Sequence, residues 1–380
     1  MRRILLLTCI AFWNMNKSIV IVYSNLGLGG IPVRIIDIIN ELSITHPGVL
    51  IYVLLKEERG FDLRSEINNP NAQVHDYWKS CKYDNACLFM LWTWWQIFII
   101  KPKIIISFIS PYGLTALFTK ILFFWRENTI VIDEGHYTST MVNSMILPGI
   151  QKLGIRLLYP RADTLIVPTK AVKNDLRNSF GIPKDIIHII PNWTKHAGKP
   201  LMRRRRRVDL ISIGRFESKK NVLPLLSLIR EIVLNHRPDL SCVFVGEGSL
   251  KNAMHRYVTD HRLEKNITIL PPAKDVFPFL ADAKIFVLHS DRSAEGFPVS
   301  ILDAMAAGAI VVSTQFLGGR EVINHANGYL VENESKMKRT IVNILAHYSA
   351  QRLRQSCAKR VVTSRFSKKQ LHEFIRTFQL

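Results

Sequence analysis

The chain has 380 residues, with 51 Lys and Arg against 30 Asp and Glu, so its formal net charge is +21. A hydrophobic fraction of 48% excludes a disordered, collagen-like or low-complexity protein. The five cysteines form no CxxC pair, which argues against a disulfide scaffold or a zinc module and favours a reducing compartment. The length predicts two domains of ordinary size.

Short apolar segments rich in β-branched residues alternate with helical patterns along the whole chain. Apolar strands separated by helices indicate a parallel sheet covered on both faces. Because the pattern occurs twice, we predict an α/β fold with two doubly wound, Rossmann-like domains facing a central cleft. The expected strands are 18–24, 50–55, 103–108, 129–133, 164–167, 210–213, 241–245, 266–270, 285–288 and 309–313. The helical patterns between them include 32–42, 88–99, 113–124, 170–180, 222–234 and 298–307.

A basic, polar segment separates the two series. Residues 193–207 contain seven Lys and Arg and no acidic residue. The expected parts are an N-terminal domain at 1–193, an interdomain linker at 194–207 and a C-terminal domain at 208–365. A basic helix over 366–380 would end the chain and could cross back to the N-terminal domain.

No segment reaches the roughly 20 apolar residues that a membrane-spanning helix needs. The most apolar run, 86–100, has 15 residues and includes Trp92, Trp94 and Trp95. A helix that is apolar on all sides is usually buried, so burial is the first interpretation, and a membrane-facing patch is the second. Residues 1–16 resemble a short signal peptide without a cleavage pattern. We expect a disposable extension, or a start codon assigned too far upstream, rather than a membrane anchor.

The positive charge is concentrated in the second half of the chain. Residues 193–380 hold 31 basic and 16 acidic residues. Such a surplus favours anionic partners, namely acidic lipids, phosphate-bearing substrates or nucleic acid, although a solvated basic face would give the same pattern. No RNA- or DNA-binding motif accompanies the arginine run 203–207, so we expect an anionic membrane surface and no nucleic acid.

Two turns of the N-terminal half could contact a ligand. Gly29 and Gly30 precede a helical pattern, and glycine there lets the backbone approach an anion at the helix N-terminus. His136 follows the expected strand 129–133 and could hydrogen-bond a sugar hydroxyl or a phosphate. A structural glycine turn and a structural histidine are the alternatives.

A turn of the C-terminal half carries two cations. Arg215 follows the expected strand 210–213, and Lys220 lies at the start of the next helix. A guanidinium can grip two oxygens of a diphosphate while an ammonium acts as a point charge, so this turn suits a diphosphate. The alternative is a solvated basic turn.

The most specific turn begins at Glu295, in the loop just before a helix. The amides of Gly296 and Phe297 are expected at the helix N-terminus, where an anion or a sugar hydroxyl could bind. Asp303 lies eight residues after Glu295, inside the helix, so one carboxylate could hold a sugar and the other a ribose. Ordinary helix capping by Glu295 is the alternative.

In their order along the chain these motifs resemble glycosyltransferase family four, retaining enzymes of the GT-B fold that use nucleotide-sugar donors. The resemblance covers nearly the whole chain. It rests on the glycine pair Gly29-Gly30, the segments 159–163, 167–176 and 180–192, the motif Gly214-Arg-Phe-x3-Lys220, the segment 245–250, and Glu295-Gly-Phe continued by Asp303-Ala-Met-Ala-Ala-Gly308.

The resemblance implies a role for each candidate residue. The cations of the 215–220 turn would neutralise the donor diphosphate as it leaves, and the carboxylate of the 295 turn would contact the donor sugar. The glycine pair would face the diphosphate from the other domain, and the nucleobase would lie against the loop after Leu270. The implied catalytic residues are Glu295, His136, Arg215 and Lys220, and the implied donor-binding residues are Gly29, Gly30, Arg215, Lys220, Gly296, Phe297 and Asp303.

Two positions depart from the family pattern. Asp303 stands where the family has a second glutamate, one methylene longer, so a ribose contact there could run through a water. Ile31-Pro32 follows the glycine pair instead of the common Ala-Glu, which bears on the choice of acceptor.

The resemblance implies a hexosyltransferase that needs no metal. It would move a hexose or N-acetylhexosamine from a UDP- or GDP-sugar to a glycan or lipid-linked acceptor in lipopolysaccharide, O-antigen or capsule synthesis. Front-face attack is the expected route to retention, and a covalent intermediate is the alternative. The inner face of the cytoplasmic membrane is the expected location. The alternatives are a nucleotide-sugar epimerase of the same fold and a non-catalytic nucleotide-sugar-binding or membrane scaffold protein with a decayed site.

Overall fold

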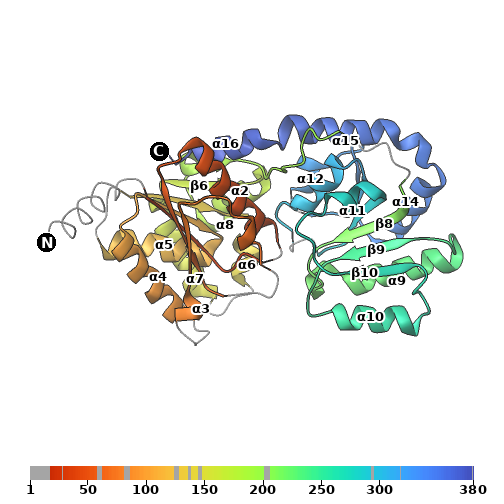
Figure 1. The fold of residues 1–380 in the computed structure, drawn as a ribbon, viewed down its shortest axis with the longest axis horizontal. Coiled ribbons are helices and arrows are strands. Elements are labelled where there is room, and N and C mark those ends of the chain that lie inside the picture. Colours follow the sequence, from red (N-terminus) through yellow and green to blue (C-terminus); the bar gives the residue numbers. More distant parts are fainter. Residues whose placement is uncertain are drawn as a thin grey trace. The chain divides into compact units, whose positions relative to one another are not determined.

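The computed structural model describes residues 18–27, 29–57, 62–80, 86–123, 128–135, 138–143, 148–200, 206–291, 295–316, 318–378 and 380. The predicted extension 1–16, the candidate His136 and arginines 203–205 lie outside these residues. The chain divides into two compact units (Figure 1). The first contains residues 18–27, Ile31–Ile190 and Leu371–Leu380, and the second contains Gly29, Gly30 and Pro191–Gln370.

Seven parallel strands of the described chain form the sheet of the first unit, in the order β3-β2-β1-β4-β5-β6-β7. The register pairs Ile19 of β1 with Ile51 of β2 on one side and with Ile104 of β4 on the other. Every residue of β4 is buried, as expected for a central strand covered by helices on both faces. The strands are β1 (Ser18–Tyr23), β2 (Leu50–Leu55), β3 (Ala72–Asp76), β4 (Ile104–Phe108), β5 (Thr129–Asp133), β6 (Thr164–Val167) and β7 (Ile187–Ile189).

Eight helices of the described chain belong to, or end in, the first unit. The last of them, α16, places the Phe374 ring under the guanidinium of Arg34. The ring centroid lies 5.4 Å from Cζ of the arginine. The helices are α2 (Gly30–Thr45), α3 (Tyr77–Ser80), α4 (Ala86–Ile100), α5 (Ser110–Leu122), α6 (Thr138–Asn143), α7 (Pro148–Leu158), α8 (Lys170–Phe180) and α16 (Lys368–Arg376).

The second unit repeats the architecture with a six-stranded sheet in the order β10-β9-β8-β11-β12-β13. Its strands are β8 (Val208–Ile213), β9 (Cys242–Val245), β10 (Ile267–Leu270), β11 (Ala283–Leu288), β12 (Ile310–Thr314) and β13 (Tyr329–Val331). One apolar core joins the sheet to α9 (Val222–Asn235), α10 (Lys251–Asp260) and α14 (Glu334–Ala346). The other joins it to α11 (Phe277–Asp282), α12 (Val299–Ala306), α13 (Gly319–Val322) and α15 (Arg352–Arg365).

The predicted α/β class with two doubly wound sheets is confirmed. All ten predicted strands are present with ends within two residues of those expected. Strands β3, β7 and β13 were not predicted, because they are short edge strands and contain no apolar run longer than three residues. Helix α2 begins at Gly30, two residues before Pro32.

Helix α4 corrects the first interpretation of the tryptophan-rich segment. Only Phe89, Thr93 and Ile97, spaced four residues apart, are buried. Trp95 is 60% exposed, so the helix is not buried on all sides. Within the described part of the chain, no helix combines the length and the hydropathy needed to cross a membrane.

Candidate functional site

The loops that follow β8 and β11 bring Lys220 and Glu295 together. The Lys220 ammonium forms an ion pair with Oε1 of Glu295. The Glu295 carboxylate is buried and the lysine is partly buried. Both loops leave the carboxyl ends of neighbouring parallel strands, which is where α/β sheets bind ligands. The structure therefore joins two of the residues that the sequence singled out.

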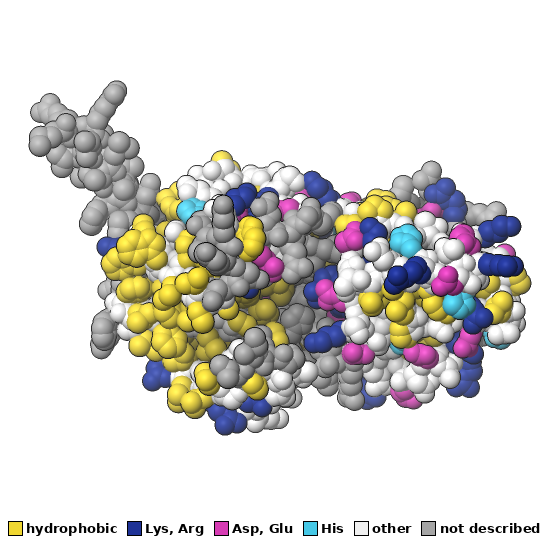
Figure 2. All heavy atoms as spheres, turned by 90° about the horizontal axis from the view of Figure 1, so that it is seen from below, with side chains coloured by type: hydrophobic (Ala, Val, Ile, Leu, Met, Phe, Trp, Pro, Cys, Tyr) yellow, Lys and Arg dark blue, Asp and Glu magenta, His cyan; other side chains and the backbone are white. Residues whose placement is uncertain are grey.

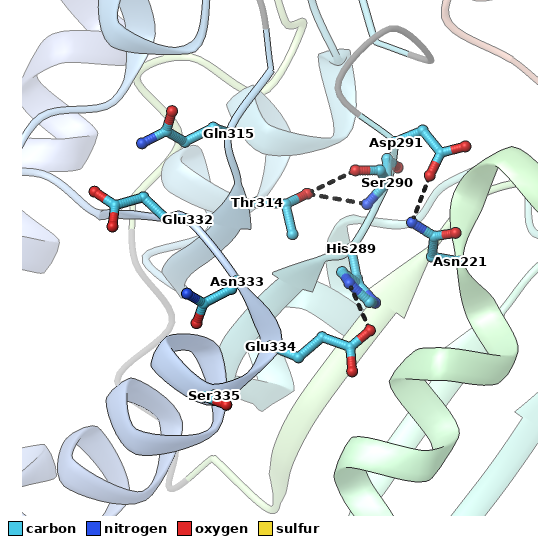
Figure 3. Close-up of a pocket in the computed structure, with 10 residues that line it drawn as sticks. All are labelled: Asn221, His289, Ser290, Asp291, Thr314, Gln315, Glu332, Asn333, Glu334 and Ser335. Atoms are coloured by element: carbon cyan, nitrogen blue, oxygen red, sulfur yellow. Dashed lines mark hydrogen bonds and ion pairs between the residues drawn. The ribbon is translucent and has the colours of Figure 1, made fainter.

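A second donor fixes the orientation of Glu295. The hydroxyl of Ser290 donates to the same Oε1 atom over 2.9 Å. Thr314, at the end of β12, in turn holds the backbone of Ser290, because its hydroxyl donates to the Ser290 carbonyl (2.9 Å) and accepts from the Ser290 amide (3.1 Å). Figure 3 shows Thr314 pointing toward Ser290. Glu295 is thus held by side chains from three neighbouring strand ends.

The two loops are also tied to each other by backbone and amide contacts. The Asp291 amide donates to the Lys219 carbonyl over 3.0 Å. Asn221 donates from Nδ2 to Oδ1 of Asp291 over 2.8 Å (Figure 3). Asn221 adopts a left-handed conformation with φ of 44°, which asparagine tolerates better than most residues. These contacts fix the turn that carries Lys220 against the loop that carries Glu295.

Two glycines of the segment 245–250 let the β9 loop approach the β8 loop. A Cβ atom on Gly246 would lie 1.9 Å from the Gly214 carbonyl oxygen, and one on Gly248 would lie 2.4 Å from that of Phe216. Any side chain there would push the turn away from the strand end. The Val-Gly-Glu-Gly motif therefore sets the position of the turn that carries Arg215.

Arg215 lies on this turn, but its guanidinium is paired with Glu217 over 3.1 Å and is 52% exposed. The structure thus shows the two predicted cations on one loop, with different partners. Arg215 pairs with an exposed carboxylate at the surface, whereas Lys220 pairs with a buried one.

The loop between Glu295 and α12 is rigidly held. Helix α12 begins at Val299, so Pro298 precedes the helix and does not occupy its first position. The Phe297 carbonyl accepts a hydrogen bond from Nδ2 of Asn192 (2.7 Å), and its ring is buried. Gly296 is buried beside it.

Asp303 lies inside α12, as predicted, and its carboxylate accepts a hydrogen bond from the hydroxyl of Thr194. The same hydroxyl accepts a hydrogen bond of 3.0 Å from the backbone amide of His196. Because Thr194 is buried, these bonds fix the segment that follows the first unit onto α12. Thr194 is a structural partner of Asp303 that the sequence did not reveal.

Replacing Thr194 with valine should lower the free energy of unfolding by about 2 kcal/mol, since a hydrogen bond to a charged group is lost along with one to a backbone amide. Urea denaturation of the wild type, Thr194→Val and Thr194→Ser measures this. Serine keeps the hydroxyl and should stay within about 1 kcal/mol of the wild type. Equal loss in both variants would show that the methyl group matters as much as the hydroxyl and would contradict this prediction.

A polar pocket of about 600 Å³ adjoins the Glu295 network (Figure 3). Ser290 lines it and also binds Glu295, so the pocket and the ion pair share a wall. His289 is buried there, which lowers its pKa, and its Nε2 lies 3.6 Å from Oε1 of Glu334. None of the lining residues was predicted, although most lie at or just after the ends of β11, β12 and β13: Asn221, His289, Ser290, Asp291, Thr314, Gln315, Glu332, Asn333, Glu334 and Ser335.

The predicted glycine pair lies in the other half of the chain. Gly29 follows β1, and Gly30 is the first residue of α2. His136 lies outside the described residues, but the turn before it is described. There Asp133 forms a buried ion pair with Arg34 (2.9 Å), and burial raises the Asp133 pKa while Arg34 lowers it.

Glu134, next in the chain, is fully buried and was not singled out by the sequence. The Tyr159 hydroxyl donates to its Oε1 atom, and the Thr138 hydroxyl donates to Oε2 over 3.0 Å. Burial raises the pKa of Glu134 from 4.5 to about 8, so the carboxyl group is neutral at pH 7 in the folded chain.

This pKa makes stability depend on pH in a definite direction. The unfolded chain loses the Glu134 proton near pH 4.5 and the folded chain near pH 8, so the free energy of unfolding falls as pH rises between these values, by about 1.4 kcal/mol per pH unit. Glu134→Gln removes this dependence. As the pH rises from 5.5 to 8, the thermal midpoint of Glu134→Gln should increase relative to that of the wild type by about 5 °C. A constant difference across that range would contradict a neutral Glu134.

Comparison with known proteins places the chain in one family. The model described as Glycosyltransferase Family 4 matches residues 28–197, and the model described as Glycosyl transferases group 1 matches residues 199–361. A Campylobacter jejuni N-acetylgalactosamine-N,N'-diacetylbacillosaminyl-diphospho-undecaprenol 4-alpha-N-acetylgalactosaminyltransferase is 24% identical over 345 residues, which cover 85% of this chain and 88% of that one.

Other relatives match over shorter stretches. An uncharacterized glycosyltransferase of Methanocaldococcus jannaschii is 26% identical over 218 residues, 54% of this chain and half (50%) of its own length. A putative colanic acid biosynthesis glycosyltransferase of Escherichia coli is 25% identical over 253 residues, 62% of this chain and 59% of its own. Among solved structures, Anabaena Alr3699/HepE in complex with UDP-glucose has a TM-score of 0.75 at 15% identity, covering 95% of this chain and all (100%) of that one, which shows the same fold.

Proposed function

The chain belongs to glycosyltransferase family four and has the GT-B fold, and from this premise we propose that it transfers a hexose or N-acetylhexosamine from a nucleotide diphosphate sugar with retention of configuration. The observation that carries the proposal is the Lys220–Glu295 ion pair at the carboxyl edge of the second sheet. It joins a cation suited to a diphosphate with a carboxylate suited to sugar hydroxyls. Arg215 supplies a second cation from the same loop.

In this proposal Arg215 and Lys220 stabilise the negative charge that develops on the diphosphate. The bond between the anomeric carbon and the diphosphate oxygen breaks, and a bond to the acceptor oxygen forms on the same face of the sugar. The acceptor proton moves to an oxygen of the departing phosphate. Glu295, oriented by Ser290, holds a hydroxyl of the donor sugar, and the amides of Gly296 and Phe297 support it.

The remaining assignments follow the same resemblance. Gly29 and Gly30 approach the diphosphate, His136 lies by the reacting centre, and Asp303 holds the ribose. We propose that Arg215 and Lys220 neutralise the leaving diphosphate and that transfer needs no metal ion. Activity should then survive EDTA.

The acceptor we propose is a glycan or lipid-linked oligosaccharide of a bacterial cell-surface polysaccharide. This is supported by the relatives, one named for a diphospho-undecaprenol acceptor and another for colanic acid biosynthesis. Such acceptors and nucleotide sugars meet at the inner face of the cytoplasmic membrane, where we place the reaction. UDP is the favoured nucleotide, because solved structures of the same fold contain UDP or UDP-glucose.

Incubation of the protein with radiolabelled UDP- and GDP-sugars and a lipid extract from a polysaccharide-producing bacterium tests the proposal. A labelled lipid product with an α-linkage from an α-linked donor would support a retaining transferase. Conversion of the donor into another sugar nucleotide without transfer would support an epimerase. Donor binding without either reaction would support a non-catalytic protein.

A further inference from the structure

Helix α4 presents an apolar face outward. Leu88, Leu91, Trp95, Phe98 and Ile99 are exposed, and the 15 residues of the helix include no charged side chain. A helix on the surface of a globular protein normally carries polar residues on its outer face. The outer face of α4 is therefore not built to meet water alone.

Two neighbouring helices extend this face. On α5 the exposed residues are Phe118, Ile121 and Leu122, and on α7 they are Ile150, Leu153 and Leu157, which follow one helical stripe. Figure 2 shows hydrophobic side chains gathered over this part of the first unit. We call the exposed residues of these three helices the apolar face.

The three helices are in direct contact, so the apolar face is continuous. The Trp94 ring of α4 stacks on the Phe118 ring of α5, with centroids 5.5 Å apart. Gly154 of α7 lies against Leu114 of α5: a Cβ atom added to Gly154 would lie 3.4 Å from a methyl carbon of the leucine. Monomeric proteins rarely expose an apolar patch of this extent, and such patches mark interaction sites.

The charged residues of the three helices are all basic. Helices α4, α5 and α7 contain no Asp or Glu, and their only charged residues are Lys120, Lys152 and Arg156. Lys120 is neutralised by Asp163 (2.6 Å), whereas Lys101 and Lys103 add exposed charge directly after α4. Cations beside an apolar surface attract acidic headgroups.

We propose that the apolar face docks on a lipid bilayer that contains anionic lipids. Tryptophan, phenylalanine and leucine side chains enter the boundary between headgroups and acyl chains, while the lysines and arginines contact acidic headgroups. A second copy fits less well, because it would set Lys152 and Arg156 against the same three helices, which contain no Asp or Glu to pair with them. Docking would bring the enzyme to a lipid-linked acceptor, and only this consequence rests on the proposed function.

Co-sedimentation with vesicles of phosphatidylcholine, with and without 30 mol% phosphatidylglycerol (roughly the charge density of an anionic bacterial leaflet), tests the docking. The full chain should bind the anionic vesicles, and binding should weaken at high salt. The triple variant Leu91→Ser/Trp95→Ser/Leu153→Ser should bind the anionic vesicles at least about tenfold more weakly than the wild type. Its matched control is Ile44→Ser/Leu234→Ser/Leu353→Ser, since these three residues are similarly exposed outside the apolar face.

Lys152→Gln/Arg156→Gln should reduce the preference for anionic over neutral vesicles while retaining some binding to both. Equal vesicle binding by the triple variant and the wild type would overturn the proposal. So would a wild-type dimer in sedimentation velocity that the triple variant dissociates, without vesicle binding by either.

Stabilisation by UDP-sugars, measured on the same variants, separates this proposal from the proposed function. The apolar face lies in the first unit, and the Lys220–Glu295 pair lies in the second. Donor binding should therefore persist in the triple variant. Vesicle binding without donor binding in the wild type would contradict only the proposed function.

Discussion

Replacing Lys220 with alanine should lower kcat/KM for sugar transfer by about 100- to 1,000-fold. Two losses combine. The diphosphate loses a positioned cation in the transition state, and the buried Glu295 carboxylate loses its ion-pair partner. Both kcat and donor affinity should fall, because the lysine meets charge that is present in the bound donor and grows as the donor leaves. Steady-state kinetics and calorimetric titration of the donor measure the two effects separately.

Lys219→Ala is the matched control for this variant. Lys219 is the preceding residue, its side chain is exposed, and its carbonyl, which accepts from the Asp291 amide, remains in alanine. The control should keep activity within about threefold of the wild type, a change below 0.7 kcal/mol. Similar losses in both variants would mean that general positive charge on the loop matters, and not the pair with Glu295.

Replacing Glu295 with glutamine should lower kcat by about 100-fold while changing donor affinity by less than a factor of about three. Glutamine keeps the size of the side chain and can still accept from Ser290, but it removes the negative charge beside the donor sugar. Since the charge matters most when the sugar becomes electron-poor, the loss should fall on kcat. Rate and binding measurements at saturating acceptor separate the two.

Ser290→Ala distinguishes charge from orientation at the same site. It leaves the Glu295 charge and its lysine partner intact and removes one hydrogen bond that orients the carboxylate. We expect a loss of about five- to tenfold, which corresponds to about 1 kcal/mol, the value of a typical hydrogen bond. A Glu295→Gln variant no slower than Ser290→Ala would contradict an electrostatic role for the carboxylate.

The strand order along the chain and the motif residues at strand ends could be predicted from the sequence, because parallel strands in α/β proteins are apolar runs and polar residues directly after them meet at one sheet edge. This reasoning correctly located Arg215, Lys220 and Glu295 at that edge. The ion pair between Lys220 and Glu295 could not be predicted, since 75 residues separate them and only the order of β8 and β11 in the sheet makes them neighbours.

Other features depend on contacts that no sequence period encodes. Ser290 and Thr314 orient Glu295 through hydrogen bonds between adjacent strand ends. Glu134 is neutral because it is buried, and a single carboxylate after a strand gives no signal of burial depth. For α4, the absence of charged residues suggested burial, but only one face of the helix is buried.

The central claim is that the second unit binds a nucleotide diphosphate sugar through the turn of Arg215 and Lys220. Thermal unfolding of the wild type and of Arg215→Ala/Lys220→Ala, each with a panel of nucleoside diphosphates and nucleotide sugars, tests it directly. A ligand at about 100 times its Kd stabilises a folded protein by about 2.7 kcal/mol. We predict a concentration-dependent rise in the wild-type midpoint with UDP and one or more UDP-sugars, and no rise in the double variant. An unchanged wild-type midpoint with every nucleotide, or an equal rise in both proteins, would contradict the claim.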